Sequence, residues 1–193
     1  MIRPDFMRAE NRDSPFPHFR VSELLPEATG DALLEWLDAD APWKLQTTDF
    51  YEQHEFSMFD CTVPSAVAHI VSDVYVADLA RELSERLDAP PLELTEVAVH
   101  RLISGQTIRI HNDHIGEEET HRLIVQLNRG WKVEQGGLFM IFEADNPESV
   151  ADVLLPVHRS AFGFEISARS HHAVSTIHSG SRDTLVYTFR HAT

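Results

Sequence analysis

Three residues in the C-terminal half of the chain have the types and spacing of ligands for one metal ion. His111 and Asp113 are separated by a single residue, and His172 follows much later in the chain. In an extended segment residues i and i+2 project from the same face, so this imidazole and this carboxylate can reach a common ion. His172 lies on a second strand-like segment that can face the first across a barrel. The sequence therefore predicts a metal site made from His111, Asp113 and His172.

Two imidazoles and one carboxylate are an incomplete ligand set. Such a facial triad is typical of non-haem Fe(II) sites and leaves positions of the metal open, whereas a structural zinc site is closed by four ligands. The His-x-Asp pair is a weak signal by itself, because the chain has 12 histidines and a turn aspartate often follows a surface histidine. His171 points to the opposite strand face from His172, so only one of the two can be a ligand.

The elements that must position these residues begin with an irregular N-terminal region. Residues 1–25 contain several prolines and isolated aromatic side chains, which indicate an extended, loop-rich segment. A short amphipathic helix is predicted over residues 32–37, with Thr29 or Asp31 as its N-cap and Pro42 beyond its end.

Strands and a longer helix are predicted to follow. Residues 43–59 are rich in threonine and aromatic side chains and predict one or two strands. The clearest helix is predicted from Pro64 to about residue 88, because apolar residues recur there at helical spacing. The pair Pro90-Pro91 ends it, since proline cannot continue the hydrogen-bond ladder.

After this helix the hydrophobic period becomes that of strands. Eight strands are predicted, at about residues 94–103, 107–111, 121–128, 137–142, 152–155, 160–165, 172–177 and 183–190. Helices followed by a run of short strands indicate an α+β fold, here a double-stranded β-helix (jelly-roll) core with helices packed on one sheet. We expect residues 1–193 to form a single domain, in which 1–91 give helical and loop support and 92–193 form the jelly-roll core that carries the site.

Composition limits the kinds of partner. The formal net charge of −15 argues against binding to nucleic-acid backbones and to anionic membranes, and it is compatible with a cationic peptide or amine. The single cysteine, Cys61, cannot form an internal disulfide. The sequence shows neither a signal-peptide core nor an apolar run of membrane-spanning length, so we expect a cytoplasmic protein without a membrane partner. It does not indicate an oligomeric state.

From Val99 to Arg190 the chain resembles the prolyl-4-hydroxylase-like branch of the Fe(II)- and 2-oxoglutarate-dependent oxygenases. The motifs that carry the resemblance occur in the order and spacing of that branch. They are Gly105-x5-His111-x-Asp113, Arg122-x4-Leu127-Asn128, Gly130-Trp131, Gly136-Gly137, Leu155-Pro156, the aromatic strand Ala161-Phe162-Gly163-Phe164, His172-x-Val174 and Gly180-x-Arg182-x-Thr184.

The resemblance implies roles for individual residues. It places His111, Asp113 and His172 at the iron-ligand positions, and its His-x-Val pattern favours His172 over its neighbour. It places Arg182 and Thr184 at the positions that bind the distal carboxylate of 2-oxoglutarate, a task that suits the planar guanidinium fork. Gln126 stands where some relatives have a tyrosine that binds the same cosubstrate. Arg101 stands where relatives often have an aromatic residue, and it is a candidate contact for substrate or cosubstrate.

The implied enzyme is a single-domain dioxygenase that uses Fe(II), 2-oxoglutarate and dioxygen. It would hydroxylate an amino-acid side chain in a peptide, a protein or a free amino acid. Two other classes stay open: a cupin-like metal protein that acts as an isomerase or a dioxygenase without 2-oxoglutarate, and a non-catalytic binding module. The acidic run 117–119 is typical of a solvated loop, and an acidic lip that selects a cationic substrate is the alternative.

Overall fold

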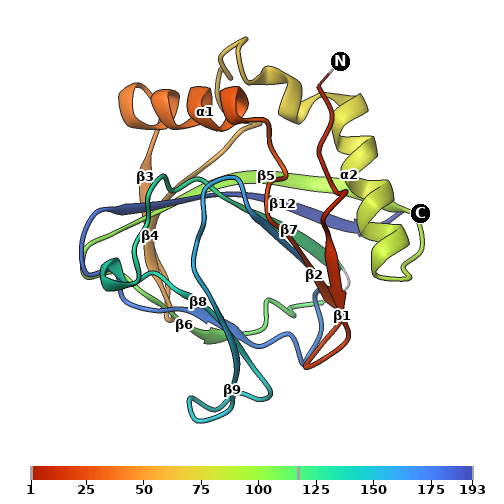
Figure 1. Ribbon diagram of the computed structural model, residues 1–193, viewed down its shortest axis with the longest axis vertical. Coiled ribbons are helices and arrows are strands. Elements are labelled where there is room, and N and C mark those ends of the chain that lie inside the picture. Colours follow the sequence, from red (N-terminus) through yellow and green to blue (C-terminus); the bar gives the residue numbers. More distant parts are fainter. Residues whose placement is uncertain (1, 117, 193) are drawn as a thin grey trace.

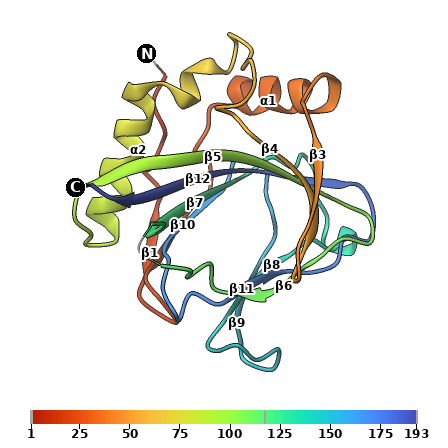
Figure 2. The same ribbon diagram turned by 180° about the vertical axis from the view of Figure 1, so that it is seen from behind.

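The structure is a computed structural model that describes residues 2–116 and 118–192. Two antiparallel sheets face each other, and the α-helices cover the outer face of the larger sheet (Figure 1). The view from behind shows the same three layers, with the smaller sheet farthest from the helices (Figure 2). Among the residues so described, no helix is long and apolar enough to cross a membrane.

The larger sheet has eight strands and is the middle layer, between the helices and the smaller sheet (Figure 1). Its spatial order is β1 (Glu10–Arg12), β2 (His18–Val21), β10 (Ala161–Glu165), β7 (His121–Gln126), β12 (Ser181–His191), β5 (Leu92–Ile103), β4 (Glu52–Ser57) and β3 (Lys44–Thr47). The long strands β5 and β12 pair along most of their length at its centre. All these pairings are antiparallel, so one face of the sheet can pack on helices while the other faces the second sheet.

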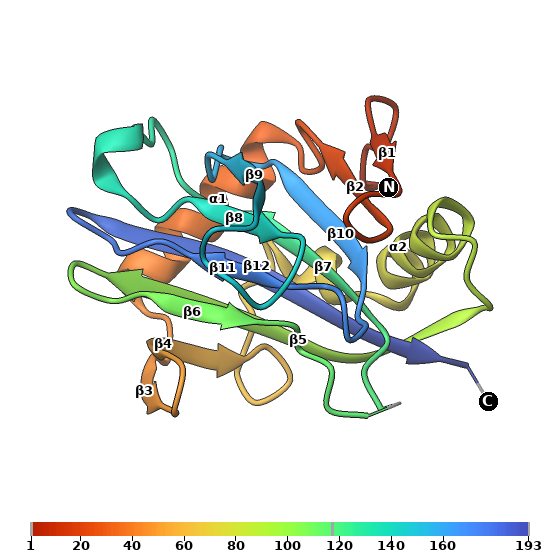
Figure 3. The same ribbon diagram turned by 90° about the horizontal axis from the view of Figure 1, so that it is seen from below.

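The smaller sheet has four strands and closes the barrel on the other side. Its order is β6 (Ile108–His111), β11 (His172–Val174), β8 (Phe139–Phe142) and β9 (Val150–Leu154). Viewed from below, this sheet crosses in front of the larger one, and the hairpin of β3 and β4 lies beside β6 (Figure 3). An isolated bridge between Tyr51 and Ile108 joins the turn of that hairpin to the smaller sheet.

Side chains alternate between two cores along each central strand. On β12, Leu185 and Tyr187 are buried against the helices, while Val186 is buried between the sheets. The helix-side core also contains residues of α1 (Glu27–Ala39) and α2 (Asp73–Arg86). This period of two is that of a strand with both faces covered.

The predicted fold class is confirmed, and all eight strands predicted in the C-terminal half are present. The region 43–59 contains the two strands β3 and β4. The prediction of a loop-rich region 1–25 missed β1 and β2, which extend the larger sheet beside β10.

The predicted starts of both helices were wrong, whereas both helices end close to the predicted positions. Helix α1 begins at Glu27 after Pro26, so Thr29 and Asp31 lie within its first turns instead of capping it. The helix predicted from residue 64 is interrupted: a 3-10 helix spans Ala68–Val71, and α2 begins only after Ser72. Ser72 has extended backbone angles and its hydroxyl accepts a hydrogen bond from the Tyr75 N–H, which makes it an N-cap.

Candidate metal centre and its pocket

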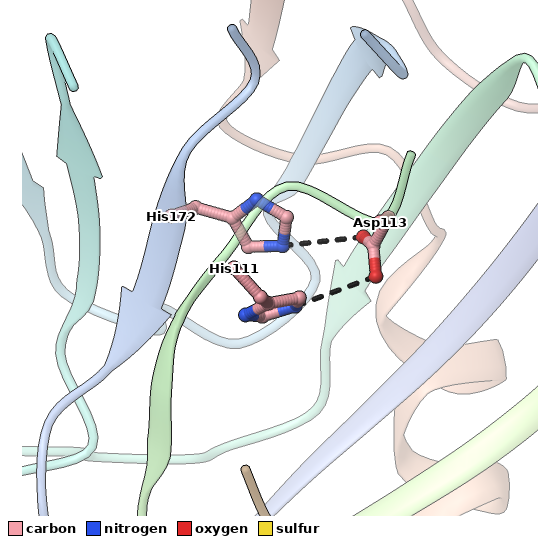
Figure 4. A group of neighbouring side chains, drawn as sticks. All are labelled: His111, Asp113 and His172. Carbon is pink, nitrogen blue, oxygen red and sulfur yellow. Dashed lines mark ion pairs between the residues drawn. The ribbon is translucent and has the colours of Figure 1, made fainter. Parts of the chain in front are cut away.

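His111, Asp113 and His172 converge at the mouth of the barrel, between the two sheets. His111 ends β6 and His172 begins β11, where the two residues are direct cross-strand partners. Asp113 turns back toward them from the loop after β6 (Figure 4); its Oδ1 lies 3.4 Å from His111 Nε2 and its Oδ2 lies 3.3 Å from His172 Nε2. Its φ of 60° is a left-handed conformation that aspartate adopts more readily than most residues. One potential ligand atom from each residue lies within 4.8 Å of the other two.

Both imidazoles are held in the orientation that metal binding requires. His111 Nδ1 lies 2.9 Å from the carbonyl oxygen of Arg109, and His172 Nδ1 lies 2.8 Å from that of Ser170. A carbonyl oxygen only accepts, so each Nδ1 carries the proton and donates, which leaves a lone pair on each Nε2. Two imidazole lone pairs and a carboxylate therefore face one another without a proton between them. A cation bound among them removes the repulsion between these groups.

The charge of Asp113 is stabilised by an arginine. Burial alone would raise the pKa of Asp113, but the charge of the Arg122 guanidinium holds that pKa well below its usual range. Arg122 Nη1 lies 2.8 Å from Asp113 Oδ2. Burial, followed by the neighbouring His111, lowers the pKa of His172 and keeps its imidazole neutral. The triad thus presents the ionisation states that a divalent metal ion needs in its ligands.

A cavity of about 480 Å³ extends inward from the triad and contains Arg182 and Thr184. Both residues project from the inner face of β12. Arg182 is 3% exposed, and within the described part of the chain its Nε has no hydrogen-bond partner. Burial lowers its pKa to about 10, so the guanidinium remains charged at neutral pH. A buried cation without a partner is costly, so this end of the cavity is suited to an anion such as a carboxylate.

The structure does not bring the other two predicted cosubstrate residues into this cavity. Gln126 lies opposite Thr184 in register, but it lines a separate cavity of about 420 Å³ on the far side of Phe139. Arg101 points to the helix side of the larger sheet, where both of its terminal contacts are carboxylates: Asp183, at 2.7 Å, and Asp38, also at 2.7 Å. These positions correct the interpretation of Arg101 as a contact for substrate or cosubstrate.

Sequence reasoning missed several residues that line the cavity. His100, next to Arg101, faces the cavity because it is one residue out of phase with Val97 and Val99, which point to the helices. The alternation of side chains along β5 could therefore have predicted that His100 faces the cavity. Tyr51, Gln53 and Glu55 line the same cavity from β4 and the turn before it, where Glu55 is the cross-strand partner of His100, and no motif in the sequence predicts them.

The acidic run after Asp113 falls partly outside the described residues, which leave out Glu117. Glu118 is exposed, as expected of a solvated loop. Glu119 instead lines the cavity, and its Oε2 lies 2.6 Å from Arg122 Nη2. Arg122 therefore contacts two carboxylates at once.

Residues 97–188 match the family model described as the 2OG-Fe(II) oxygenase superfamily. A prolyl-4-hydroxylase of Pseudomonas putida superimposes with a TM-score of 0.70 and 18% identity, covering 91% of this chain and 93% of that one. A search of curated proteins found no match.

Two further solved structures have the same fold. A prolyl hydroxylase of Trichoplax adhaerens, in complex with a peptide fragment of the hypoxia inducible factor oxygen degradation domain, has a TM-score of 0.75 and 13% identity over 90% of this chain and 83% of that one. The viral collagen prolyl hydroxylase of Paramecium Bursaria Chlorella virus-1, in complex with 2OG, has a TM-score of 0.66 and 15% identity over 91% and 96% of the two chains.

The fold and the triad define a non-haem iron oxygenase. Over residues 97–188 the chain is similar to the 2OG-Fe(II) oxygenase superfamily, and it has the fold of the prolyl hydroxylase structures. Its cofactors are those of the superfamily: Fe(II), 2-oxoglutarate and dioxygen. The residues present fit this set, because the triad offers three donors to a divalent ion and Arg182 offers an unpaired charge to a dicarboxylate.

Proposed function

We propose that this protein is a hydroxylase that holds Fe(II) with His111, Asp113 and His172. In this proposal Arg182 and Thr184 bind the distal carboxylate of 2-oxoglutarate. The unpaired, buried guanidinium of Arg182 in the same cavity as the triad is the observation that carries the proposal. A metal protein that did not use an anionic cosubstrate would have no need of that charge.

The bound iron and cosubstrate supply the oxidation, in which dioxygen hydroxylates a C–H bond while 2-oxoglutarate is converted to succinate and carbon dioxide. The chain supplies orientation and a dry cavity. The carbonyls of Arg109 and Ser170 fix the imidazole rings, and Arg122 fixes the Asp113 carboxylate. Ile124, Val174 and other apolar side chains line the cavity and exclude water from the oxidised carbon.

The substrate in this proposal is an amino-acid side chain, presented by a peptide or protein or by a free amino acid. A peptide is supported by the Trichoplax adhaerens enzyme, which was solved with one. It is also supported by the cavity mouth, where Ile115 is 89% exposed and offers an apolar contact to a longer substrate. The reaction is limited to the one side chain that enters the cavity.

We also propose that residues 1–193 act as a single oxygenase domain located in the cytoplasm. The cavity is lined from both parts of the chain, since Tyr51 and Gln53 line it together with His111 and Arg182. Cys61 is a free thiol, which suits a reducing compartment. Fractionation of cells that express the tagged chain tests the location.

The proposed sites are tested by anaerobic titration of the Fe(II)-loaded protein with 2-oxoglutarate, followed by the visible charge-transfer band. His172→Ala should abolish the band. Arg182→Ala should weaken 2-oxoglutarate binding by roughly two orders of magnitude, because a bidentate charge-assisted pair contributes about 3 kcal/mol. Arg190→Ala is the matched control, since Arg190 lies on the same strand, is half exposed and pairs with Glu93 at the surface.

Unchanged 2-oxoglutarate affinity in Arg182→Ala would contradict the assignment of the cosubstrate site. If folded, iron-loaded wild-type protein gives no band at all, the hydroxylase proposal fails. A cupin-like metal protein or a binding module would then take its place.

A further inference from the structure

The charges of the side chains that line the cavity do not sum to zero. They comprise three carboxylates and two guanidiniums: Glu55, Asp113, Glu119, Arg122 and Arg182. Arg122 pairs with Asp113 at 2.8 Å and with Glu119 at 2.6 Å. Under the proposed function, Arg182 pairs with the cosubstrate. Glu55 is then left without a cation.

The neighbours of Glu55 do not neutralise it. Within the described residues its one ion-pair contact is with His100, whose Nε2 lies 3.9 Å from Glu55 Oε2. Burial, followed by the charge of Arg122, lowers the pKa of His100 to about 4, so this imidazole is neutral at physiological pH. Glu55 therefore places an uncompensated negative charge on the cavity wall.

Gln53, two residues before Glu55 on the same face of β4, adds a second acceptor. Its Nε2 donates a hydrogen bond of 2.7 Å to Glu55 Oε2, and this bond fixes the amide orientation because the reverse orientation would set oxygen against carboxylate. The Gln53 side chain is 2% exposed, and its Oε1 has no hydrogen-bond partner among the described residues. A buried acceptor of this kind needs a donor.

Glu55 and the metal site act on the same part of the cavity. The Tyr51 ring lies in the lining between them, and its phenol pKa is raised by burial and then by the charge of Glu55, with smaller effects from Arg122 and Asp113. A substrate that spans from the triad to β4 would thus meet two acceptors, one of them charged.

We propose that the substrate carries a cationic nitrogen, an ammonium or guanidinium group, that is bound by Glu55 and Gln53 while a nearby carbon is held at the metal site. This inference rests on the proposed function and names its substrate class: a basic amino-acid side chain. The N–H groups of such a cation satisfy Gln53 Oε1, and its charge balances Glu55. The net charge of −15 steers cationic substrates toward the protein.

The test is calorimetric binding to the anaerobic protein loaded with Fe(II) and 2-oxoglutarate. The probes are two matched pairs, arginine with citrulline and lysine with norleucine, each as the free amino acid and as its N-acetyl amide. At least one basic probe should bind about tenfold or more tightly than its neutral partner, as expected for a charge-assisted hydrogen bond. Preference for the free or the blocked form distinguishes an amino-acid substrate from a peptide.

Two variants on the same strand decide whether Glu55 is responsible. Glu55→Gln keeps an acceptor for Gln53 but removes the charge, and it should reduce the preference to less than about twofold. Glu52→Gln makes the same change at an exposed position outside the cavity, where the acceptor for Gln106 is retained, and should leave the preference intact.

The outcomes separate the two proposals. Equal binding of basic and neutral probes in every pair, or a preference that survives in Glu55→Gln, overturns the inference while the hydroxylase assignment stands. Wild-type protein that fails to bind 2-oxoglutarate overturns both.

Discussion

Adjacent residues on β12 serve opposite faces of the larger sheet. Arg182 and Thr184 project into the cavity, whereas Asp183 between them is buried on the helix side. Asp183 receives two hydrogen bonds of 2.7 Å from Arg101, and the Arg101 guanidinium stacks 4.6 Å from the Trp43 ring. The Arg101–Asp183 pair therefore fixes the strand that carries the cosubstrate residues without touching the cosubstrate.

Replacing Arg101 should affect stability and leave the site unchanged. Arg101→Met should lower the free energy of unfolding by about 3 kcal/mol, because it leaves the Asp183 carboxylate buried and unpaired. Chemical denaturation measures this effect. Arg190→Met, which breaks a pair at the surface, should cost less than about 1 kcal/mol.

In the same Arg101→Met variant the dissociation constant of 2-oxoglutarate should stay within about twofold of wild type, since Arg101 lies outside the cavity. A large loss of 2-oxoglutarate affinity in a folded variant would restore Arg101 as a cosubstrate contact.

The residues of the site differ in how far the sequence can predict them. His111 and Asp113 could be predicted from the single residue between them, although Asp113 reaches the site through a turn with a φ of 60° after β6 and not along an extended strand. The segment of His172 stands out by its own pattern. The prediction for Arg101 was wrong because Arg101 lies on the same strand face as Val97 and Val99, which pack against the helices. Gln53 and Glu55 could not be predicted, because polar residues on a short strand are usually exposed, and only the pairing of β4 with β5 turns them inward.

At the scale of elements, the break before α2 depends on one side chain. Ser72 accepts a hydrogen bond from the Tyr75 N–H, and its own hydroxyl donates to the His69 carbonyl at 2.7 Å. The apolar pattern on both sides of Ser72 continues at helical spacing, so periodicity alone predicts one helix where the structure has two. Capping by Ser72 competes with continuation of one helix through this residue. Hydrophobic periodicity does not show which of the two forms.

Ser72→Ala should therefore destabilise the protein by about 1 kcal/mol through loss of the N-cap. The thermal unfolding midpoint measures this effect. Binding of 2-oxoglutarate should not change, because α2 lies across the larger sheet from the cavity (Figure 1). Ser72→Asp serves as the control that retains a capping acceptor and should keep wild-type stability.

Long-range pairing also limited the prediction of elements. Phe19 and Val21 on β2 alternate as expected for a strand, but the segment has only four residues and lies between prolines and turns. Its partner is β10, which lies far along the chain. Such a short segment becomes a strand only when the sheet edge is present, so tertiary context decides it.

At the scale of the whole molecule, buried histidines make stability depend on pH. Burial lowers the pKa of His100 and of His121 to about 4, and it also lowers that of His18. In the unfolded chain a histidine titrates near pH 6.5. Between about pH 6.5 and pH 4 the unfolded state therefore binds more protons than the folded state, so stability falls as the pH falls through this window.

We expect the metal-free protein to lose stability between pH 7.5 and pH 5, by about 1–2 kcal/mol from His121 alone. Urea denaturation at the two pH values in the presence of a chelator measures the loss. His121→Gln should reduce the difference between the two pH values by that amount. A pH dependence that is unchanged in His121→Gln would show that this histidine is not responsible.

The hairpin of β3 and β4 lies at the margin of the larger sheet, where β4 pairs with β5 and the hairpin turn bridges β6 through Tyr51 and Ile108 (Figure 3). The iron and cosubstrate residues belong to the central and opposing strands instead. In these proposals residues of β4 select the substrate, whereas residues of other strands hold the iron and the cosubstrate. Descendants of this enzyme are free to acquire new substrates by divergence within residues 44–57 while inheriting the same catalytic machinery intact.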